Sequence, residues 1–338
     1  MGDTTDTVAE PDAHLVSIVG SDLTFHVAEG ERILTAARRA GTWLPFECGW
    51  GGCGTCKVTV VEGETQLLDD APSIDPRDAR RRRVVVCQST ATSDLSIRAG
   101  NSSTEPPPER PVLDHKGVLL AREDLGPDLA RFHFRLDAEA LFRPGQHAIL
   151  ELGDGVRRCY SLAGQPGSCE VRFIAKRYAG GLGSARLFAV GEGEEVPLEL
   201  PYGDMFVRDG DAPVVLVAGG TGISAILAIA EQLSLARTSR TVHVFYGAGT
   251  AAELICWDEL RDAMTAIADG HLHGALIEPP AGWAGATGFV TAALGESLPD
   301  LADAVFHVAG PPLMTDATVD LLRQHGIQLD KVHYDSFG

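Results

Sequence analysis

Four of the seven cysteines in this chain follow a spacing that suits metal ligation. Cys48, Cys53 and Cys56 lie in one short loop, and thirty residues separate Cys56 from Cys87. Four glycines lie among residues 47–56. Glycine permits the sharp bends and close backbone approach that three thiolates around one cluster require. An odd number of cysteines in a long chain without a secretory signal argues against a disulfide framework.

The Cys-x4-Cys-x2-Cys…Cys spacing is typical of plant-type [2Fe–2S] ferredoxins, which predicts a cluster on Cys48, Cys53, Cys56 and Cys87. The alternatives are a zinc site or free thiols. Zinc sites usually use two paired-cysteine knuckles, so the cluster is favoured. The other three cysteines fall outside the pattern and are expected to be packing residues. They are Cys159, Cys169 and Cys256.

Two glycine-containing turns each follow an apolar run. The first, Gly219-Gly220-Thr221-Gly222, ends a predicted strand and opens a predicted helix. A dinucleotide pyrophosphate binds in that context. The second turn runs from Ala309 to Met314. For either turn alone, a tight α/β connection is an equal alternative, but two in this order favour a nucleotide site.

Further motifs resemble the ferredoxin–NADP reductase superfamily. Arg158-Cys159-Tyr160-Ser161 matches its Arg-x-Tyr-Ser motif, and Gly181-Leu182-Gly183-Ser184 matches its Gly-x-x-Ser motif. The two glycine turns are similar to its Gly-Gly-x-Gly and Cys-Gly-Pro-Pro-x-Met motifs. The resemblance implies FAD binding by Arg158, Tyr160, Ser161, Ala175, Lys176, Gly181, Gly183, Ser184 and Phe337. It implies NAD binding by Gly219, Gly220, Thr221, Gly222, Gly247, Ala309, Gly310, Pro311 and Met314.

The same resemblance implies individual roles for the flavin residues. Arg158 would pair with the FAD pyrophosphate, which suits a guanidinium fork. Tyr160 would pack on the isoalloxazine, and Ser161 would reach flavin N5 as the one catalytic side chain. Relatives end with an aromatic residue that covers the flavin, and Phe337 is the candidate. The alternative is that Tyr334 or Phe337 caps the core.

Three departures from the family pattern affect the nicotinamide side. Ala309 stands where a cysteine is usual, Ala225 replaces a common proline, and Gly249 occupies a position where many relatives have arginine. Residues 242–260 contain no Arg or Lys to bind a 2′-phosphate, so NADH is favoured over NADPH.

The hydrophobic pattern predicts a multidomain chain. A tail (1–13) precedes a β-grasp-like α+β ferredoxin domain (14–100), a proline-rich linker (101–111), an antiparallel β-barrel FAD domain (112–208) and an α/β, doubly wound parallel-sheet NAD domain (209–338). Expected elements include a hairpin in 15–27, a helix in 31–40 and strands at 57–62 and 83–88. In the last domain, strands at 214–218, 242–246 and 304–309 lead into helices at 223–235, 251–264 and 313–325.

Charge and composition exclude several partners. The formal net charge is −19 and the sequence pI about 4.9. This acidity disfavours nucleic acid and anionic lipid. No apolar run reaches the length of a membrane span, and the polar N-terminus is neither a secretory signal nor a transit peptide, so a cytoplasmic location is expected. The basic run Arg80–Arg83 suits an acidic partner or another domain, but such a run is more often a solvated face.

From about residue 14 the chain resembles the reductase components of bacterial multicomponent oxygenases. This implies electron transfer from NADH through FAD and a [2Fe–2S] cluster to an oxygenase or hydroxylase component, or to its carrier protein. Reductases of soluble di-iron monooxygenases, acting on hydrocarbons or aromatics, are the first choice. A Rieske-type dioxygenase reductase, a reductase for a sugar-deoxygenating enzyme or for flavin supply, and a non-enzymatic redox carrier or sensor are the alternatives.

Overall fold

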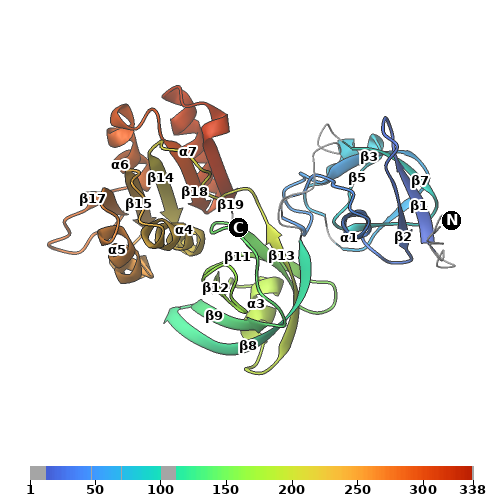
Figure 1. Ribbon diagram of the computed structural model, residues 1–338, viewed down its shortest axis with the longest axis horizontal. Helices are drawn as coiled ribbons and strands as arrows, with labels where there is room; N and C mark the ends of the chain where they lie inside the picture. Colours follow the sequence, from blue (N-terminus) through green and yellow to red (C-terminus); the bar gives the residue numbers. More distant parts are fainter. Residues whose placement is uncertain (1–12, 47, 70, 100–111, 337–338) are drawn as a thin grey trace, which may run out of the picture. The chain divides into compact units, whose positions relative to one another are not determined.

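The structure is a computed structural model that describes residues 13–46, 48–69, 71–99 and 112–336 (Figure 1). It divides into two compact units. One comprises the chain up to Val112 together with Glu151–Cys159, and the other comprises Leu113–Leu150 and everything from Tyr160 onward. The predicted C-terminal aromatic, Phe337, lies outside the described residues.

The ferredoxin segment folds as a five-stranded mixed sheet packed on one helix, the β-grasp-like arrangement that we expected. The sheet order is β2-β1-β7-β3-β5, with β1 and β7 parallel. Side chains of β1, β7 and α1 alternate or recur at helical spacing, which buries Val16, Ile33 and Ile97 in one core. The elements are β1 (Ala13–Ile18), β2 (Thr24–Ala28), α1 (Ile33–Arg39), β3 (Lys57–Glu62), β5 (Arg83–Val85) and β7 (Leu95–Arg98).

Three short elements of this segment were not expected from the sequence. Strands β4 (Thr65–Leu67) and β6 (Ser89–Ala91) pair with each other, and the helix α2 (Pro76–Arg80) precedes β5. Asp75 caps α2 by accepting hydrogen bonds from the backbone of its first turn. The strand predicted for 83–88 ends at Val85, so Cys87 lies in a turn between β5 and β6 rather than in a strand. That prediction was wrong because an apolar run does not reveal where the chain must turn.

The central segment forms a six-stranded antiparallel sheet. Its order is β11-β10-β13-β8-β9-β12. A bridge between Ala163 and Arg172 joins the chain after β11 to β12, so the two edges meet and the sheet closes into the expected barrel. The elements are β8 (Leu113–Gly126), β9 (Leu129–Leu136), β10 (His147–Glu151), β11 (Arg157–Ser161), β12 (Glu170–Lys176), α3 (Leu182–Ala189) and β13 (Glu195–Tyr202).

The C-terminal segment forms a parallel sheet with the order β17-β16-β15-β14-β18-β19. Helices α4 and α5 cover one face, and α6 and α7 cover the other, as a doubly wound fold requires. The strands are β14 (Val214–Gly219), β15 (Val242–Ala248), β16 (Gly270–Leu276), β17 (Ala286–Thr287), β18 (Val305–Gly310) and β19 (Val332–Ser336). The helices are α4 (Ile223–Leu235), α5 (Trp257–Thr265), α6 (Val290–Ser297) and α7 (Pro312–Gln324).

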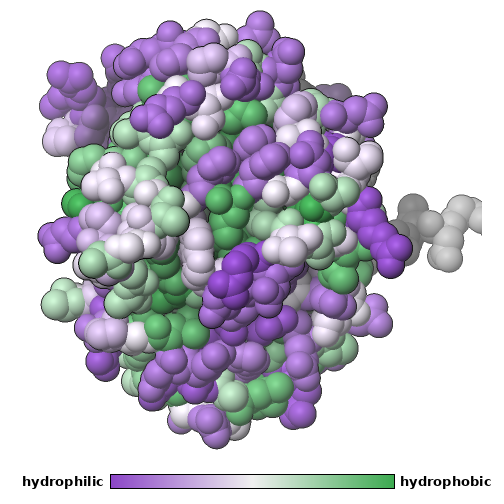
Figure 2. Space-filling view, turned by 90° about the vertical axis from the view of Figure 1, so that its left-hand side faces the viewer, coloured by the Kyte–Doolittle hydropathy of each residue, from purple (hydrophilic) through white to green (hydrophobic). Residues whose placement is uncertain are grey.

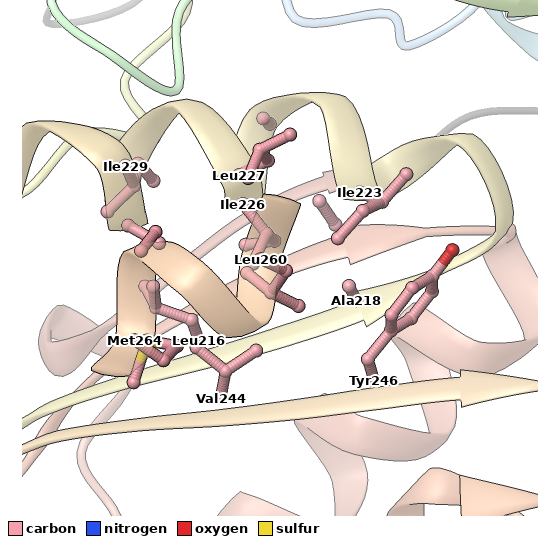
Figure 3. Packing of buried hydrophobic residues seen from close by; sticks show 14 of the residues in the cluster. Leu216, Ala218, Ile223, Ile226, Leu227, Ile229, Val244, Tyr246, Leu260 and Met264 are labelled. Carbon is pink, nitrogen blue, oxygen red and sulfur yellow. The ribbon is translucent and has the colours of Figure 1, made fainter. Parts of the chain in front are cut away.

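Figure 3 shows how the α4–α5 face of this sheet is filled. Leu216 and Val244 of neighbouring strands point at Ile226 of α4 and Leu260 of α5, and all four are buried. Continuously apolar strands are expected where a sheet is covered on both faces. Helix α5 begins at Trp257 rather than at the predicted Ala251, because a short 3-10 turn and the left-handed Cys256 (φ 57°) precede it.

The hydropathy of the surface agrees with the composition, in which 44% of the residues are hydrophobic and 22% are charged. In Figure 2, which views the side where β17 and α5 lie in Figure 1, hydrophilic side chains cover most of the face and apolar ones show in small groups between them. No helix within the described residues is long and apolar enough to cross a membrane.

Candidate cofactor sites

The four predicted cluster ligands come from two places in the ferredoxin segment. Cys48, Cys53 and Cys56 lie in the loop between α1 and β3, and Cys87 lies in the turn after β5. Three of the four side chains are buried, whereas Cys53 is exposed. The site therefore has one solvent-facing corner.

The four thiols are arranged as two close pairs. The sulfur atoms of Cys56 and Cys87 are 3.2 Å apart, and the backbone N–H of Cys53 donates to the sulfur of Cys48 at 3.4 Å. Hydrogen bonding within each pair lowers the pKa of Cys53 to about 5 and lowers that of Cys56, while it raises the pKa of Cys48 and of Cys87. In the described residues, no three His, Cys, Asp or Glu side chains converge on a point that would hold a single metal ion.

This pairing fits a cluster that carries its own positive charge. Two thiols so close together cannot both lose their protons without a cation between them, because like charges repel strongly in a buried site. Iron supplies that charge and takes thiolate ligands. The donor set and its pairwise arrangement therefore suit a two-iron cluster with one cysteine pair for each iron.

The loop around the thiols depends on glycine and on its neighbours. Gly51 adopts a φ of 89°, and a Cβ on Gly52 would lie 2.2 Å from the ring of Trp50. The hydroxyl of Ser73 donates to the Gly51 carbonyl at 2.6 Å, and the Gln88 amide donates to a second loop carbonyl. Sequence reasoning identified the glycines but not these two polar supports.

The flavin motif lies on β11 of the barrel. Because side chains alternate along a strand, Arg158 and Tyr160 belong to one face and Ser161 to the other. The Tyr160 ring lies 6.3 Å from that of Phe173. Ser161 is buried, and its carbonyl accepts a hydrogen bond of 3.3 Å from the hydroxyl of Ser224 on α4. The end of the flavin strand is thus joined to the first turn of the nucleotide helix.

The second flavin motif forms the start of α3. Gly181 is the N-cap residue, and the Ser184 hydroxyl donates to its carbonyl at 3.1 Å. Gly183 is buried in the first turn, where free backbone N–H groups are available to phosphate oxygens. Ala175 is buried at the end of β12, and the ammonium of Lys176 lies 5.9 Å from the ring of Tyr178.

The two nicotinamide turns lie side by side at the carboxyl edge of the parallel sheet. Strands β14 and β18 are direct neighbours, with Ala218 opposite Ala309. A Cβ on Gly222 would lie 2.1 Å from the Ala309 carbonyl oxygen, and a Cβ on Gly219 would lie 2.4 Å from the Met314 sulfur. The two turns therefore approach one another only because glycine occupies both positions.

The remaining predicted nucleotide residues lie at the same edge. Gly247 is the second-to-last residue of β15, and a Cβ there would lie 2.7 Å from the Cβ of Val290. Gly220 and Thr221 form the first turn after β14, Gly310 ends β18, and Pro311 precedes α7. Open α/β sheets bind their ligands at this edge, beyond the carboxyl ends of the strands. Tyr334 is 48 % exposed on the edge strand β19, so it does not cap the core.

One polar network was missed by sequence reasoning. Arg131 on β9 is nearly buried, and its guanidinium contacts both carboxylate oxygens of Glu259 on α5 at 2.6 and 2.8 Å. It also bonds Glu123 at 3.0 Å and the Cys256 sulfur at 3.1 Å. Burial by itself lowers the pKa of Arg131, but Glu259 raises it overall, so the group stays charged. Cys256 is thus a hydrogen-bonding partner and not simply a packing residue.

Three protein families match successive parts of the chain. The 2Fe-2S iron-sulfur cluster binding domain matches residues 16–92, the oxidoreductase FAD-binding domain matches residues 116–206, and the oxidoreductase NAD-binding domain matches residues 216–320. Their order is the order of the sites described above. Fold and sites together define an iron–sulfur flavoprotein oxidoreductase that uses a [2Fe–2S] cluster, FAD and NAD.

Whole-length relatives narrow this class. The ferredoxin–NAD(+) reductase component of the alkene monooxygenase system of Xanthobacter autotrophicus is 34% identical over 93% of this chain and 97% of its own length. The reductase component of phenol 2-monooxygenase of Pseudomonas sp. (strain CF600) is 34% identical over 91% of this chain and 90% of its own. The structure of the ferredoxin reductase in carbazole 1,9a-dioxygenase has a TM-score of 0.84 at 30% identity, covering 96% and 98% of the two chains. The chain belongs to the family of reductase components of multicomponent oxygenases.

The contact between the nicotinamide turns can be tested with Gly222→Ala. We expect the added Cβ to push the Ala309 carbonyl away, which raises the KM for NADH about tenfold and lowers stability by about 1–3 kcal/mol. NADH kinetics with ferricyanide and thermal denaturation would measure both effects. Gly295→Ala in α6 is the control, because its nearest neighbours lie 3.8 Å away. Equal NADH kinetics for the two variants would contradict the prediction.

Proposed function

We propose that this chain passes electrons from NADH to the oxygenase component of a multicomponent monooxygenase that acts on hydrocarbons or aromatics. Relatives named as alkene and phenol monooxygenase reductases support this choice of acceptor. The observation that carries the relay is the presence in one chain of paired cluster thiols, a flavin strand and two interlocking glycine turns. Domain boundaries at 14–100, 112–208 and 209–338 stay a prediction, as does a cytoplasmic location.

A second acceptor class is favoured by one observation. The structural neighbour with a TM-score of 0.84 is the ferredoxin reductase in carbazole 1,9a-dioxygenase, and the match covers 96% of this chain and 98% of that one. Reduction of a Rieske-type dioxygenase is therefore the alternative function. Sugar-deoxygenating or flavin-supply roles differ only in the acceptor and have no observation of their own.

The cofactors supply the electron chemistry: bound flavin takes a hydride and releases single electrons, and the bound [2Fe–2S] cluster carries one electron at a time. We assign the cluster to Cys48, Cys53, Cys56 and Cys87, of which only Cys53 is exposed to solvent. The exposed corner at Cys53 is where an acceptor approaches the cluster most closely.

The barrel and the nucleotide domain hold and orient the reactants. Arg158 and the N-terminus of α3 would hold the FAD pyrophosphate, Tyr160 would pack against the flavin ring, and Ser161 would donate a hydrogen bond to flavin N5. The hydrogen bond from Ser224 to the Ser161 carbonyl keeps the strand end against α4, where the nicotinamide turn begins. Orientation of this kind lowers the entropic barrier to hydride transfer.

The cluster can be separated from the flavin by Cys53→Ser. We expect the cluster absorbance and NADH-dependent cytochrome c reduction to fall by at least about tenfold, while ferricyanide reduction, which needs only the flavin, changes less than about twofold. Cys169→Ser, at another exposed cysteine, is the matched control and should change neither rate. Negligible NADH oxidation with any acceptor would favour a non-enzymatic carrier instead.

The role of Ser161 can be tested with Ser161→Ala. Loss of one hydrogen bond to the reacting flavin should slow flavin reduction by about tenfold, because about 1.4 kcal/mol corresponds to that factor. Stopped-flow absorbance under anaerobic conditions measures the rate, and the cluster spectrum should stay intact. Ser168→Ala, elsewhere on the barrel, serves as the comparison. An unchanged rate of flavin reduction in Ser161→Ala would remove this role.

A preference for NADH follows from the end of β15. Glu253 folds back over the turn, where its carboxylate accepts a hydrogen bond from the Thr250 backbone at 3.1 Å, and residues 242–260 contain no Arg or Lys. An acidic residue in this region disfavours a 2′-phosphate. We expect kcat/KM for NADPH at least about tenfold below that for NADH, and Glu253→Gln should narrow the difference. Equal use of both nucleotides by the wild-type protein would contradict this assignment.

A further inference from the structure

Positive charge is concentrated in one short segment of an otherwise acidic protein. The formal net charge is −19, and residues 112–338 contain 17 Lys and Arg against 30 Asp and Glu. Residues 13–99 are nearly balanced, with 10 against 11, but five of the ten basic residues lie between positions 77 and 83. We call these five the arginine patch: Arg77, Arg80, Arg81, Arg82 and Arg83.

The guanidinium groups of the patch face solvent. All five residues are exposed, and Arg80 and Arg81 form no ion pair with any described residue. The two nearest carboxylates are already engaged within the fold. Asp75 caps α2, and Asp78 is buried against Lys57 at 2.7 Å. Arg82 pairs with Glu64 and Arg83 with Asp78, each at 3.4 Å, so the unpaired positive charge of the patch, among the described residues, lies on Arg77, Arg80 and Arg81.

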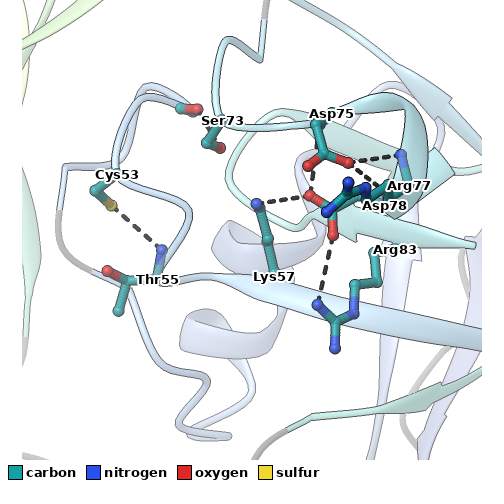
Figure 4. A network of polar contacts seen from close by, with 9 residues as sticks. Cys53, Thr55, Lys57, Ser73, Asp75, Arg77, Asp78 and Arg83 are labelled. Carbon is teal, nitrogen blue, oxygen red and sulfur yellow. Dashed lines mark hydrogen bonds and ion pairs between the residues drawn. The ribbon is translucent and has the colours of Figure 1, made fainter. Parts of the chain in front are cut away.

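Three bonds hold the patch beside the cluster loop (Figure 4). The backbone N–H and the hydroxyl of Ser73, just before α2, both donate to the Gly51 carbonyl, at 3.2 and 2.6 Å. Lys57, the residue after Cys56, pairs with Asp78 of α2. Arg77 and Arg80 lie on α2, Arg83 lies on β5, and Arg81 and Arg82 form the turn between them. The patch is therefore fixed next to the loop that presents Cys53, the exposed cysteine.

We propose that the arginine patch is the docking surface for an acidic face of the protein that accepts single electrons, an inference that rests on the proposed function. An acidic partner is repelled by the chain as a whole, but within a Debye length of about 8–10 Å the patch dominates the field it meets. Among the described residues, such a partner is attracted most strongly beside Cys53. A basic partner would be attracted by most of the acidic surface, so electrostatic attraction would not direct it to the cluster.

The test reverses charge in the patch of the full-length holoprotein with Arg80→Glu and Arg81→Glu together. The control, Lys116→Glu with Arg135→Glu, makes the same change in net charge at exposed positions of the barrel. The probe is the soluble haem domain of cytochrome b5, an acidic one-electron acceptor. Its equilibrium binding in the oxidised form is measured by titration calorimetry, where no electron moves. Its second-order rate of reduction is measured at rising NaCl concentrations.

We expect the patch variant to bind the acidic acceptor at least about tenfold more weakly at low salt and to lose most of the salt dependence of its rate, with the control within about threefold of wild type. Equal effects in the two variants would show that only net charge matters and would overturn the proposal. Slower NADH-driven reduction of the cluster in the patch variant, without acceptor, would assign the patch to an internal contact and overturn it too. Wild-type protein whose cluster NADH cannot reduce would instead contradict the proposed function, since binding is measured separately.

Discussion

Charge repulsion among four cysteines is the constraint on which the ferredoxin segment depends. Thiols held as close as Cys56 and Cys87 resist joint ionisation, so the pair is stable in its metal-binding form only with positive charge between the sulfurs. The chain meets this requirement with a loop of small residues that the backbone of β3 and the turn after β5 hold from two sides. The polar bonds of Ser73 and Gln88 to loop carbonyls then fix a segment that has little side-chain packing of its own.

The carboxyl edge of the parallel sheet also depends on the absence of side chains at particular positions. The carbonyl of Ala309 occupies the space that a Cβ on Gly222 would need, and the Met314 side chain occupies that beside Gly219. In such close packing, each glycine is needed to leave room for the neighbouring turn as well as for a ligand. The Ser224–Ser161 hydrogen bond extends the same edge to the flavin strand. The end of the flavin strand β11 and the start of the nucleotide helix α4 are therefore held together by a direct hydrogen bond.

Much of the fold could be predicted because its elements have strong apolar periodicity. Strand β3 and helix α4 have the predicted limits, since each ends where the hydrophobic pattern ends. Strand β16 was not predicted because histidines occupy its alternate positions. His271 and His273 stack there against His243, and burial lowers the pKa of His243 to about 4. Aromatic packing of a polar residue type leaves no hydrophobic signal in the sequence.

The candidate sites were accessible to sequence reasoning only where residue spacing carries chemistry. The cysteines and the two glycine turns have such a spacing, and the structure brings the thiols into close pairs and the two turns into contact. The roles of the flavin motif residues stay a prediction. The bonds from Ser73 to the Gly51 carbonyl join residues 22 positions apart, so no local sequence pattern reveals them. Phe337 lies outside the described residues, and its role as a flavin cover stays a prediction.

The buried Arg131 has a consequence for exchanging parts between relatives. Its charge lies on the barrel, while one of its acceptors, Glu259, lies on a helix of the nucleotide domain. Glu259 is partly exposed, and Glu123 of the barrel also pairs with Arg131 at 3.0 Å, so losing Glu259 removes one of the two carboxylates that balance this buried charge and carries a stability penalty. A barrel transplanted onto a foreign nucleotide domain would inherit that penalty unless the graft also carried the matching acid. The stability of the two domains is therefore coupled through this ion pair. Functional chimeras should take Arg131 and Glu259 from the same parent.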